Sequence, residues 1–147
     1  MLTLRDEAAT TALGRSLARV VRARGILDLT ILLDAPLGAG KTALARGFLQ
    51  ELGAPGPIAS PTYAIVHSYA VASHADVYRV DDLAALEQTG LLDDVGRGIW
   101  LIEWASRFPT AWPRERLALT LAVDHELRTV QIEAVGKAAQ SLVQALT

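Results

Sequence analysis

Apolar residues recur along the chain with two spacings, and the wider spacing predicts helices. Between Asp6 and Arg24 the recurrence is every three or four positions, which is typical of a helix with one buried face. Asp6 is a suitable N-cap for this helix and Gly25 ends it. Similar patterns predict a helix over residues 40–52, ended by Gly53, and a last helix over residues 137–146. Shorter helical turns are expected over residues 82–88 and 91–95.

The other apolar segments predict strands. Continuous runs at residues 28–34 and 98–103 are typical of strands that are buried on both faces. Residues 117–123 and 130–134 alternate strictly and predict a hairpin that turns at Asp124 to Leu127. A second hairpin is expected from strands at 64–71 and 75–78, with its turn at Ser73 and His74. Residues 108–113 are predicted to form a loop or a short helix.

The stretch from Leu32 to Ala43 has the composition of a phosphate-binding loop. An apolar strand enters a small-residue loop, which ends in Gly40-Lys41-Thr42 and opens a helix. Such a loop aims backbone N–H groups at phosphate, while the lysine adds charge and the threonine hydroxyl can bind Mg²⁺. The usual first glycine is replaced by Ala35, which is followed by Pro36. A chance Gly-Lys-Thr is the alternative, and the strand-loop-helix context disfavours it.

Glu103 is the next candidate for chemistry. It ends the buried run Ile99 to Ile102, which is the pattern of a Walker B acid. A carboxylate at the carboxyl end of a strand beside the phosphate loop can hold Mg²⁺. The alternative is an exposed glutamate at the end of a strand.

Residues 74–79 form a second cluster. Alternation places His74, Asp76 and Tyr78 on one face of a strand, which suits metal, water or phosphate chemistry. A polar face on an edge strand is the alternative, and a zinc site is disfavoured because further ligands at suitable spacing are missing from the sequence. Thr62, in Ser60-Pro61-Thr62, is either part of a switch that senses the γ-phosphate or part of an ordinary turn.

Trp104 could stack on a base or fill the core, and the core is the more common position for tryptophan. The residue pattern places Lys137 and arginines 114, 116 and 128 on the solvated surface. None of the arginines is an evident source of positive charge for a transition state.

Composition limits the class of protein. The 147 residues favour a single domain spanning 1–147, and 51% apolar with 20% charged residues is a globular balance. A net charge of −2 gives no broad basic field for nucleic acid. The sequence has no cysteine, no signal-type N-terminus and no membrane-length apolar run, so a cytoplasmic protein without membrane association is expected.

Taken together, the motifs resemble the bacterial TsaE (YjeE) family of P-loop ATPases in tRNA threonylcarbamoyladenosine biosynthesis. The similarity covers nearly the whole chain and lies in the order of six short motifs. They are T-x-x-L-G (10–14), L-G-A-G-K-T (37–42), R-G-F-L (46–49), S-P-T-Y (60–63), H-x-D-x-Y-R (74–79) and I-E-W (102–104). The family usually has Gly-Asp where this chain has Ala35-Pro36.

The resemblance implies an α/β, P-loop NTPase-like three-layer domain with a mixed sheet, in which a parallel core carries added antiparallel hairpin strands. It implies ATP and Mg²⁺ as cofactors, with Thr42 and Glu103 holding the metal and Lys41, Asp76 and Glu103 as the catalytic residues. The residues expected to contact the nucleotide are Thr10, Leu37, Gly38, Ala39, Gly40, Lys41, Thr42, Ala43, Thr62, Trp104 and Arg128.

The resemblance also implies TsaD and TsaB as partners, with tRNA reached indirectly through their complex. Because no arginine in the sequence is an evident finger, slow intrinsic ATP hydrolysis that partners activate is expected. A small-molecule kinase and a nucleotide-dependent scaffold without hydrolysis are the alternatives. Residues 80–98 contain only Arg97 as a basic residue, which argues against the arginine-rich lid of a kinase.

Overall fold

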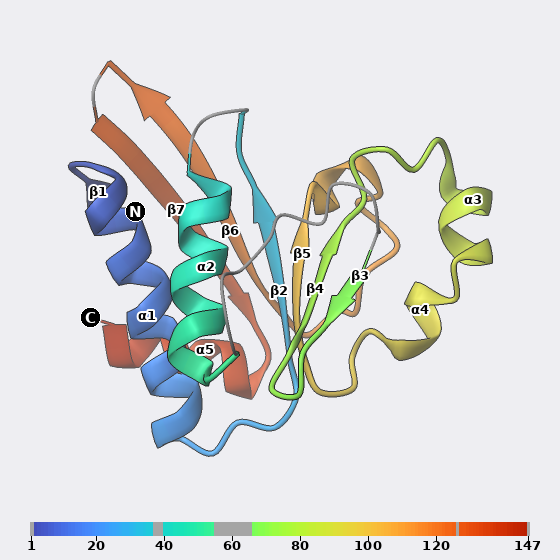
Figure 1. Ribbon diagram of the computed structural model, residues 1–147, viewed down its shortest axis with the longest axis horizontal. Helices are drawn as coiled ribbons and strands as arrows, with labels where there is room; N and C mark the ends of the chain where they lie inside the picture. The colour runs from blue at the N-terminus through green and yellow to red at the C-terminus, as the bar shows by residue number, and fades with distance from the viewer. Residues whose placement is uncertain (1, 37–39, 55–65, 126, 147) are drawn as a thin grey trace.

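The computed structural model describes residues 2–36, 40–54, 66–125 and 127–146. A seven-stranded mixed sheet forms its centre, with the strands in the order β1-β7-β6-β2-β5-β4-β3 (Figure 1). Strands β2, β4, β5 and β6 are parallel, whereas β1, β3 and β7 pair antiparallel with their neighbours. The strands are β1 (Leu2–Leu4), β2 (Leu29–Asp34), β3 (Val66–Ser68), β4 (Ser73–Asp76), β5 (Ile99–Glu103), β6 (Arg116–Asp124) and β7 (Leu127–Val135).

The helices cover both faces of this sheet. They are α1 (Glu7–Ala23), α2 (Lys41–Leu52), α3 (Leu83–Gln88), α4 (Leu91–Asp94) and α5 (Lys137–Leu146), with a short 3₁₀ helix η1 at Ala105–Arg107. One apolar cluster packs α1, α2 and α5 on one face, and a second packs α3, α4 and η1 on the other. The two groups of helices lie on opposite sides in Figure 1. The predicted three-layer α/β architecture is therefore confirmed.

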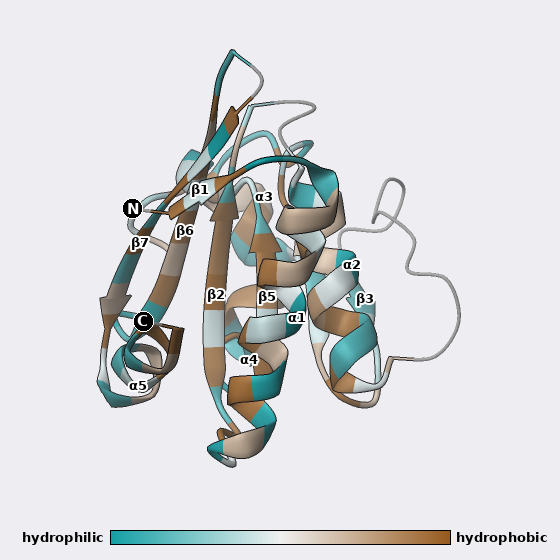
Figure 2. Cartoon of the chain, turned by 90° about the vertical axis from the view of Figure 1, so that its left-hand side faces the viewer, coloured by the Kyte–Doolittle hydropathy of each residue, from teal (hydrophilic) through white to brown (hydrophobic). Residues whose placement is uncertain are grey.

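Strand β2 lies at the middle of the sheet because its residues are apolar on both faces. Leu29 to Leu33 are all buried, and β2 is brown along much of its length in Figure 2. Its neighbours β5 and β6 run in the same direction, so all three carboxyl ends point toward one edge of the sheet. This edge carries Ala35 and Pro36, the start of the predicted phosphate loop.

Helices α1 and α2 approach each other at two glycines. A Cβ added to Gly14 would overlap the carbonyl oxygen of Leu44, and a Cβ added to Gly47 would overlap the carbonyl oxygen of Thr11. The backbones themselves are therefore in contact, and no side chain separates them. This close packing fixes the position of α2, whose first turn carries Lys41 and Thr42.

The predicted helix boundaries are confirmed at several points. Asp6 is the N-cap of α1 and its carboxylate accepts from the N–H of Ala9 (2.8 Å). Asp82 caps α3 in the same way, with 2.8 Å to the N–H of Ala85. Gly53 ends α2 with φ of 107°, in the left-handed region that glycine tolerates.

The hairpin of β3 and β4 differs from the prediction. The predicted turn at Ser73 and His74 is wrong, because these residues begin β4. The chain reverses at Tyr69 to Ala72, where the N–H of Tyr69 donates to the carbonyl oxygen of Ala72 (2.8 Å). Tyr78 lies beyond the strand that was predicted to contain it. Of the strand predicted over residues 64–71, residues 66–68 form β3 and residues 64–65 lie outside the described part. Polar residues suggested a turn, but tertiary contacts hold His74 in the sheet.

Two smaller differences concern short elements. Strand β1 was not predicted, since three residues carry too little periodicity to recognise. Residues 108–113 form turns, and the short helix precedes them at η1. Within the described part of the chain, no helix combines the length and the apolarity needed to cross a bilayer.

Candidate functional site

The carboxyl ends of β2, β5 and β4 bring three acidic residues together. Leu33 of β2, next to Asp34, pairs with Glu103 of β5, and Glu103 pairs in turn with Asp76 of β4. Because these strands are parallel neighbours, residues 29–34, 73–76 and 99–103 present their ends at one place. The start of α2 lies against the same edge, since Lys41 and Thr42 line one pocket with Asp76 and Glu103.

Lys41 is the cation among these carboxylates. It is only 7% exposed, and its Nζ donates to the carbonyl oxygen of Ala35 at 3.1 Å. Loss of solvent lowers its pKa, and the negative charges of Glu103, Asp76 and Asp34 oppose this effect. Lys41 therefore lies buried beside three acids.

Trp104 covers the other side of Lys41. The Nζ atom lies 3.4 Å from the centroid of the Trp104 ring, which is a close cation–π contact. The centroid of the Tyr78 ring lies 4.7 Å from that of the Trp104 ring, and the two ring planes are tilted by 42°. Trp104 adopts a φ of 63°, a conformation that costs a residue with a Cβ roughly 1–2 kcal/mol. Trp104 is half-buried and packs against the second apolar cluster, so its expected core position is confirmed in part, while its ring also contacts Lys41.

Asp76 is partly buried at the end of β4. Its Oδ1 accepts from the N–H of Tyr78 (2.9 Å). Desolvation raises the pKa of Asp76, and the negative charge of Glu103 adds to this rise, while the Tyr78 N–H, Lys41 and His74 oppose it. The charged form of Asp76 is thus disfavoured in the folded chain relative to the unfolded chain.

Replacing Asp76 with asparagine is expected to raise the thermal stability of the nucleotide-free protein at neutral pH. A carboxyl whose folded pKa lies above its unfolded value binds its proton more tightly in the folded state, so its ionised form opposes folding at high pH. The gain should be present above the folded pKa and disappear as the pH falls below the unfolded value near 3.8. Thermal unfolding of both proteins across this pH range measures it. A gain that persisted at the lowest pH would contradict this origin.

Glu103 is buried and paired. It is 3% exposed, so the alternative of an exposed strand-end glutamate is wrong. Its Oε2 lies 2.6 Å from Nε2 of His74, which is itself 1% exposed. The pattern had singled out His74 only as a member of the polar face of a strand, and this contact was not predicted.

Arg128 reaches the same edge from β7. Its Nη1 donates to Oγ1 of Thr10 (3.2 Å) and lies beside Gly40 at the start of α2. The solvated surface position that the residue pattern predicted for Arg128 is therefore only partly correct, because the side chain is half-buried and hydrogen-bonded. The nucleotide contact that the family resemblance implies for Arg128 stays a prediction. Thr10 is fully buried, and its hydroxyl also lies 3.1 Å from the carbonyl oxygen of Asp6, to which it can donate.

A pocket of about 290 Å³ opens where these elements meet. Its described lining residues are Glu7, Pro36, Gly40, Lys41, Thr42, Ala43, Asp76, Glu103, Trp104 and Arg128. Thr42 is exposed at the first turn of α2, where unpaired N–H groups and the helix dipole favour an anion. Among the described residues, no group of three or more acidic, histidine or cysteine side chains could hold a metal alone. The carboxylates of Asp76 and Glu103 and the hydroxyl of Thr42 are oxygen ligands of the kind that Mg²⁺ takes, together with phosphate oxygens.

Comparison with known proteins identifies the family. The family model described as threonylcarbamoyl adenosine biosynthesis protein TsaE matches residues 4–131. The chain belongs to the TsaE family.

Relatives of this family member cover most of its length. It is 29% identical to the TsaE protein of Haemophilus influenzae, over 97% of this chain and 94% of that protein. It is 36% identical to TsaE of Bacillus subtilis, over 78% of this chain and 75% of that protein. The fold is similar to the crystal structure of YdiB from Bacillus subtilis, with a TM-score of 0.72 and 25% identity, over 99% of this chain and 91% of that one.

The predicted site residues of this TsaE family member fall into three groups. Gly40, Lys41, Thr42, Ala43, Asp76, Glu103, Trp104 and Arg128 line the pocket. Thr10 does not line the pocket, but its hydroxyl oxygen accepts a hydrogen bond from the lining residue Arg128. Leu37, Gly38, Ala39 and the Ser60-Pro61-Thr62 segment lie outside the described residues, and their roles stay predictions.

Two lining residues, Glu7 and Pro36, were not predicted. Glu7 follows the N-cap of α1, and no local signal in the sequence indicates that α1 begins beside the phosphate loop. Pro36 had been noted only as a departure from the usual loop pattern.

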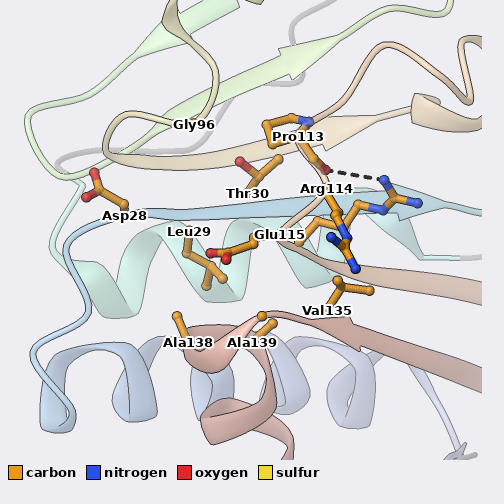
Figure 3. A pocket seen from close by; sticks show the side chains of 12 residues that line it. Asp28, Leu29, Thr30, Gly96, Pro113, Arg114, Glu115, Val135, Ala138 and Ala139 are labelled. Atoms are coloured by element: carbon orange, nitrogen blue, oxygen red, sulfur yellow. Dashed lines mark hydrogen bonds between the residues drawn. The ribbon is translucent and has the colours of Figure 1, made fainter.

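A second pocket, of about 320 Å³, lies near the opposite end of β2, between residues 28–30, residues 113–116 and the start of α5 (Figure 3). Its charged lining residues are Asp28, Arg114, Glu115 and Arg116. Asp28 accepts from the N–H of Gly98 (2.6 Å) and Arg116 donates to the carbonyl of Pro113 (3.2 Å). The predicted surface position of Arg116 is thus only partly correct. Both side chains make contacts within the chain, and no predicted site residue lies in this pocket.

Proposed function

We propose that this TsaE family member binds ATP with Mg²⁺ and hydrolyses it in support of threonylcarbamoyladenosine formation in tRNA. One observation carries the proposal: the pocket at the start of α2 joins Lys41 and Thr42 to the carboxylates of Asp76 and Glu103. A buried cation, a helix N-terminus and two acids are the groups that phosphoryl transfer requires. The relatives from Haemophilus influenzae and Bacillus subtilis are tRNA threonylcarbamoyladenosine biosynthesis proteins, which suggests the pathway.

Each residue has a distinct part in this proposal. Lys41 and the N–H groups at the start of α2 bind the phosphates, while Arg128 closes the side of the pocket beside Gly40. Thr42 and Glu103 hold Mg²⁺, which would neutralise negative charge that develops on the phosphates. Asp76 orients a water molecule, and its raised pKa suits a group that exchanges a proton.

The contacts of Lys41 support slow turnover in the isolated chain. Its ammonium is engaged by the Trp104 ring and the Ala35 carbonyl, and a phosphate competes with these contacts. We propose TsaD and TsaB as the partners that favour the active arrangement, with tRNA reached through their complex. The net charge of −2 agrees with indirect contact to tRNA.

The test is phosphate release from ATP with and without TsaD and TsaB. We expect a slow Mg²⁺-dependent rate for the chain alone and a faster rate with partners. A fast rate of phosphate release that is the same with and without TsaD and TsaB would contradict the proposal. A phosphorylated acceptor would indicate a kinase instead, and full support of tRNA modification by a Glu103→Ala protein that binds ATP without hydrolysis would indicate a scaffold.

A further inference from the structure

The contact between His74 and Glu103 joins two buried polar side chains from neighbouring strands. The distance between His74 Nε2 and Glu103 Oε2 is 2.6 Å, and the side chains are 1% and 4% exposed. Two atoms with lone pairs repel at this distance, so a proton lies between them. A glutamate that binds a divalent cation is ionised, and a carboxylate can only accept, so in that state the proton belongs to Nε2 and His74 is the donor.

This contact leaves Glu103 with its two oxygens in different roles. Oε2 is occupied by His74, whereas Glu103 also lines the pocket beside Lys41 and Asp76. The other oxygen, Oε1, therefore remains for a ligand in the pocket. Because the carboxylate is held at one oxygen, rotation of its carboxyl group is restricted.

Stability alone does not require the His74–Glu103 pair, because two apolar side chains in its place would avoid burying polar atoms. The second ring nitrogen of His74, Nδ1, is buried and has no hydrogen-bond partner, and it is the one such side-chain atom in the described part of the chain. An unpaired buried nitrogen is unfavourable, and an apolar side chain would avoid it. The pairing of β4 with β5 is made by the backbone, so it does not need this side chain.

We propose that His74 is a positioning residue for Glu103: by holding Oε2, it presents Oε1 to the divalent cation that accompanies the nucleotide. The proposal rests on the proposed function, since it requires a metal–nucleotide complex in the pocket. His74 itself touches neither the metal nor the nucleotide. It acts as the residues behind metal ligands do, which orient a ligand by a hydrogen bond.

The experiment compares His74→Leu, which removes the donor, with His74→Gln, which keeps an N–H of similar reach. Mn²⁺ serves as the probe, and its binding in the presence of a non-hydrolysable ATP analogue is followed by electron paramagnetic resonance. We expect His74→Leu to weaken Mn²⁺ binding about ten-fold. Affinity for the analogue in EDTA should stay within about two-fold of wild type, and His74→Gln should regain most of the metal affinity.

Two controls separate positioning from a general effect on the fold. His67 is the residue opposite His74 in the pairing of β3 with β4. His67→Leu removes its imidazole and should leave Mn²⁺ affinity unchanged. In a Glu103→Gln background, His74→Leu should have little further effect, because the ligand through which it acts is already altered. Circular dichroism establishes that each variant is folded.

The inference is overturned if the folded His74→Leu protein binds Mn²⁺ within about two-fold of wild type. It is overturned as well if His74→Leu lowers Mn²⁺ affinity as much in the Glu103→Gln background as it does in the wild type. It is also overturned if the His74→Leu protein does not fold and His74→Gln, though folded, loses as much metal affinity as Glu103→Gln. Wild-type protein that binds neither nucleotide nor its metal complex would overturn the proposed function and this inference together. Binding by wild type without hydrolysis would contradict only the proposed ATPase activity.

Discussion

Replacing Lys41 with alanine should lower the rate of ATP hydrolysis by on the order of 100-fold or more and weaken ATP binding. Lys41 is the lysine that lines the pocket, and its buried position among Glu103, Asp76 and Asp34 makes its charge effective at short range. The fold should tolerate the change, because burial already disfavours the charged ammonium. Phosphate release and fluorescence of a labelled nucleotide measure the two effects.

The chain contains a closely matched control. Lys137 also follows a glycine with positive φ and also begins a helix, since Gly136 precedes α5 as Gly40 precedes α2. Lys137 is exposed, in agreement with its predicted surface position, and does not line the pocket. Lys137→Ala should therefore hydrolyse ATP like wild type. Equal losses in the two variants, or an active Lys41→Ala protein, would refute the assignment of the phosphate-binding loop.

Replacing Gly47 with alanine should lower the free energy of unfolding by about 3 kcal/mol, near the upper end of the usual cost of overpacking. The new methyl group would overlap the carbonyl oxygen of Thr11, and backbone cannot turn aside as a flexible side chain can. Helices α1 and α2 would have to separate. Because Thr10 of α1 holds Arg128 beside Gly40 of α2, separation should also disturb the pocket. Denaturant unfolding followed by circular dichroism measures the change.

The sign of this effect is informative. In an exposed helix, alanine in place of glycine raises the free energy of unfolding by up to about 1 kcal/mol. Helix propensity alone therefore predicts that Gly47→Ala stabilises the protein. Ala12, exposed on α1, provides the control: Ala12→Gly should cost about 1 kcal/mol through propensity. A Gly47→Ala protein more stable than wild type would show that the helices do not touch as the structure has them.

The elements that sequence predicted well are those with a clear local signal. The first helix carries its N-cap in Asp6, and β2 and β5 are continuous apolar runs. The hairpin of β3 and β4 lacked such a signal, because its turn at Tyr69 to Ala72 contains neither glycine nor proline. The polar Ser73 and His74 suggested the turn, yet the backbone pairing of both residues with β5 places them in the strand.

Sequence by itself predicted a strand, a phosphate loop and a helix in succession, of which the structure confirms the strand β2 and the helix α2, and it placed Lys41, Thr42 and Glu103 among the candidates. Those inferences depend on residues close together in the chain, where periodicity and the chemistry of glycine and lysine act directly. Only the tertiary structure decided which residues face one another across the site. It paired β4 with β5, which set Asp76 and His74 beside Glu103, and it brought Arg128 from β7 to Thr10 and Gly40. The physical reason is that strand order and register come from packing between distant segments, and the local pattern of each strand fits more than one neighbour.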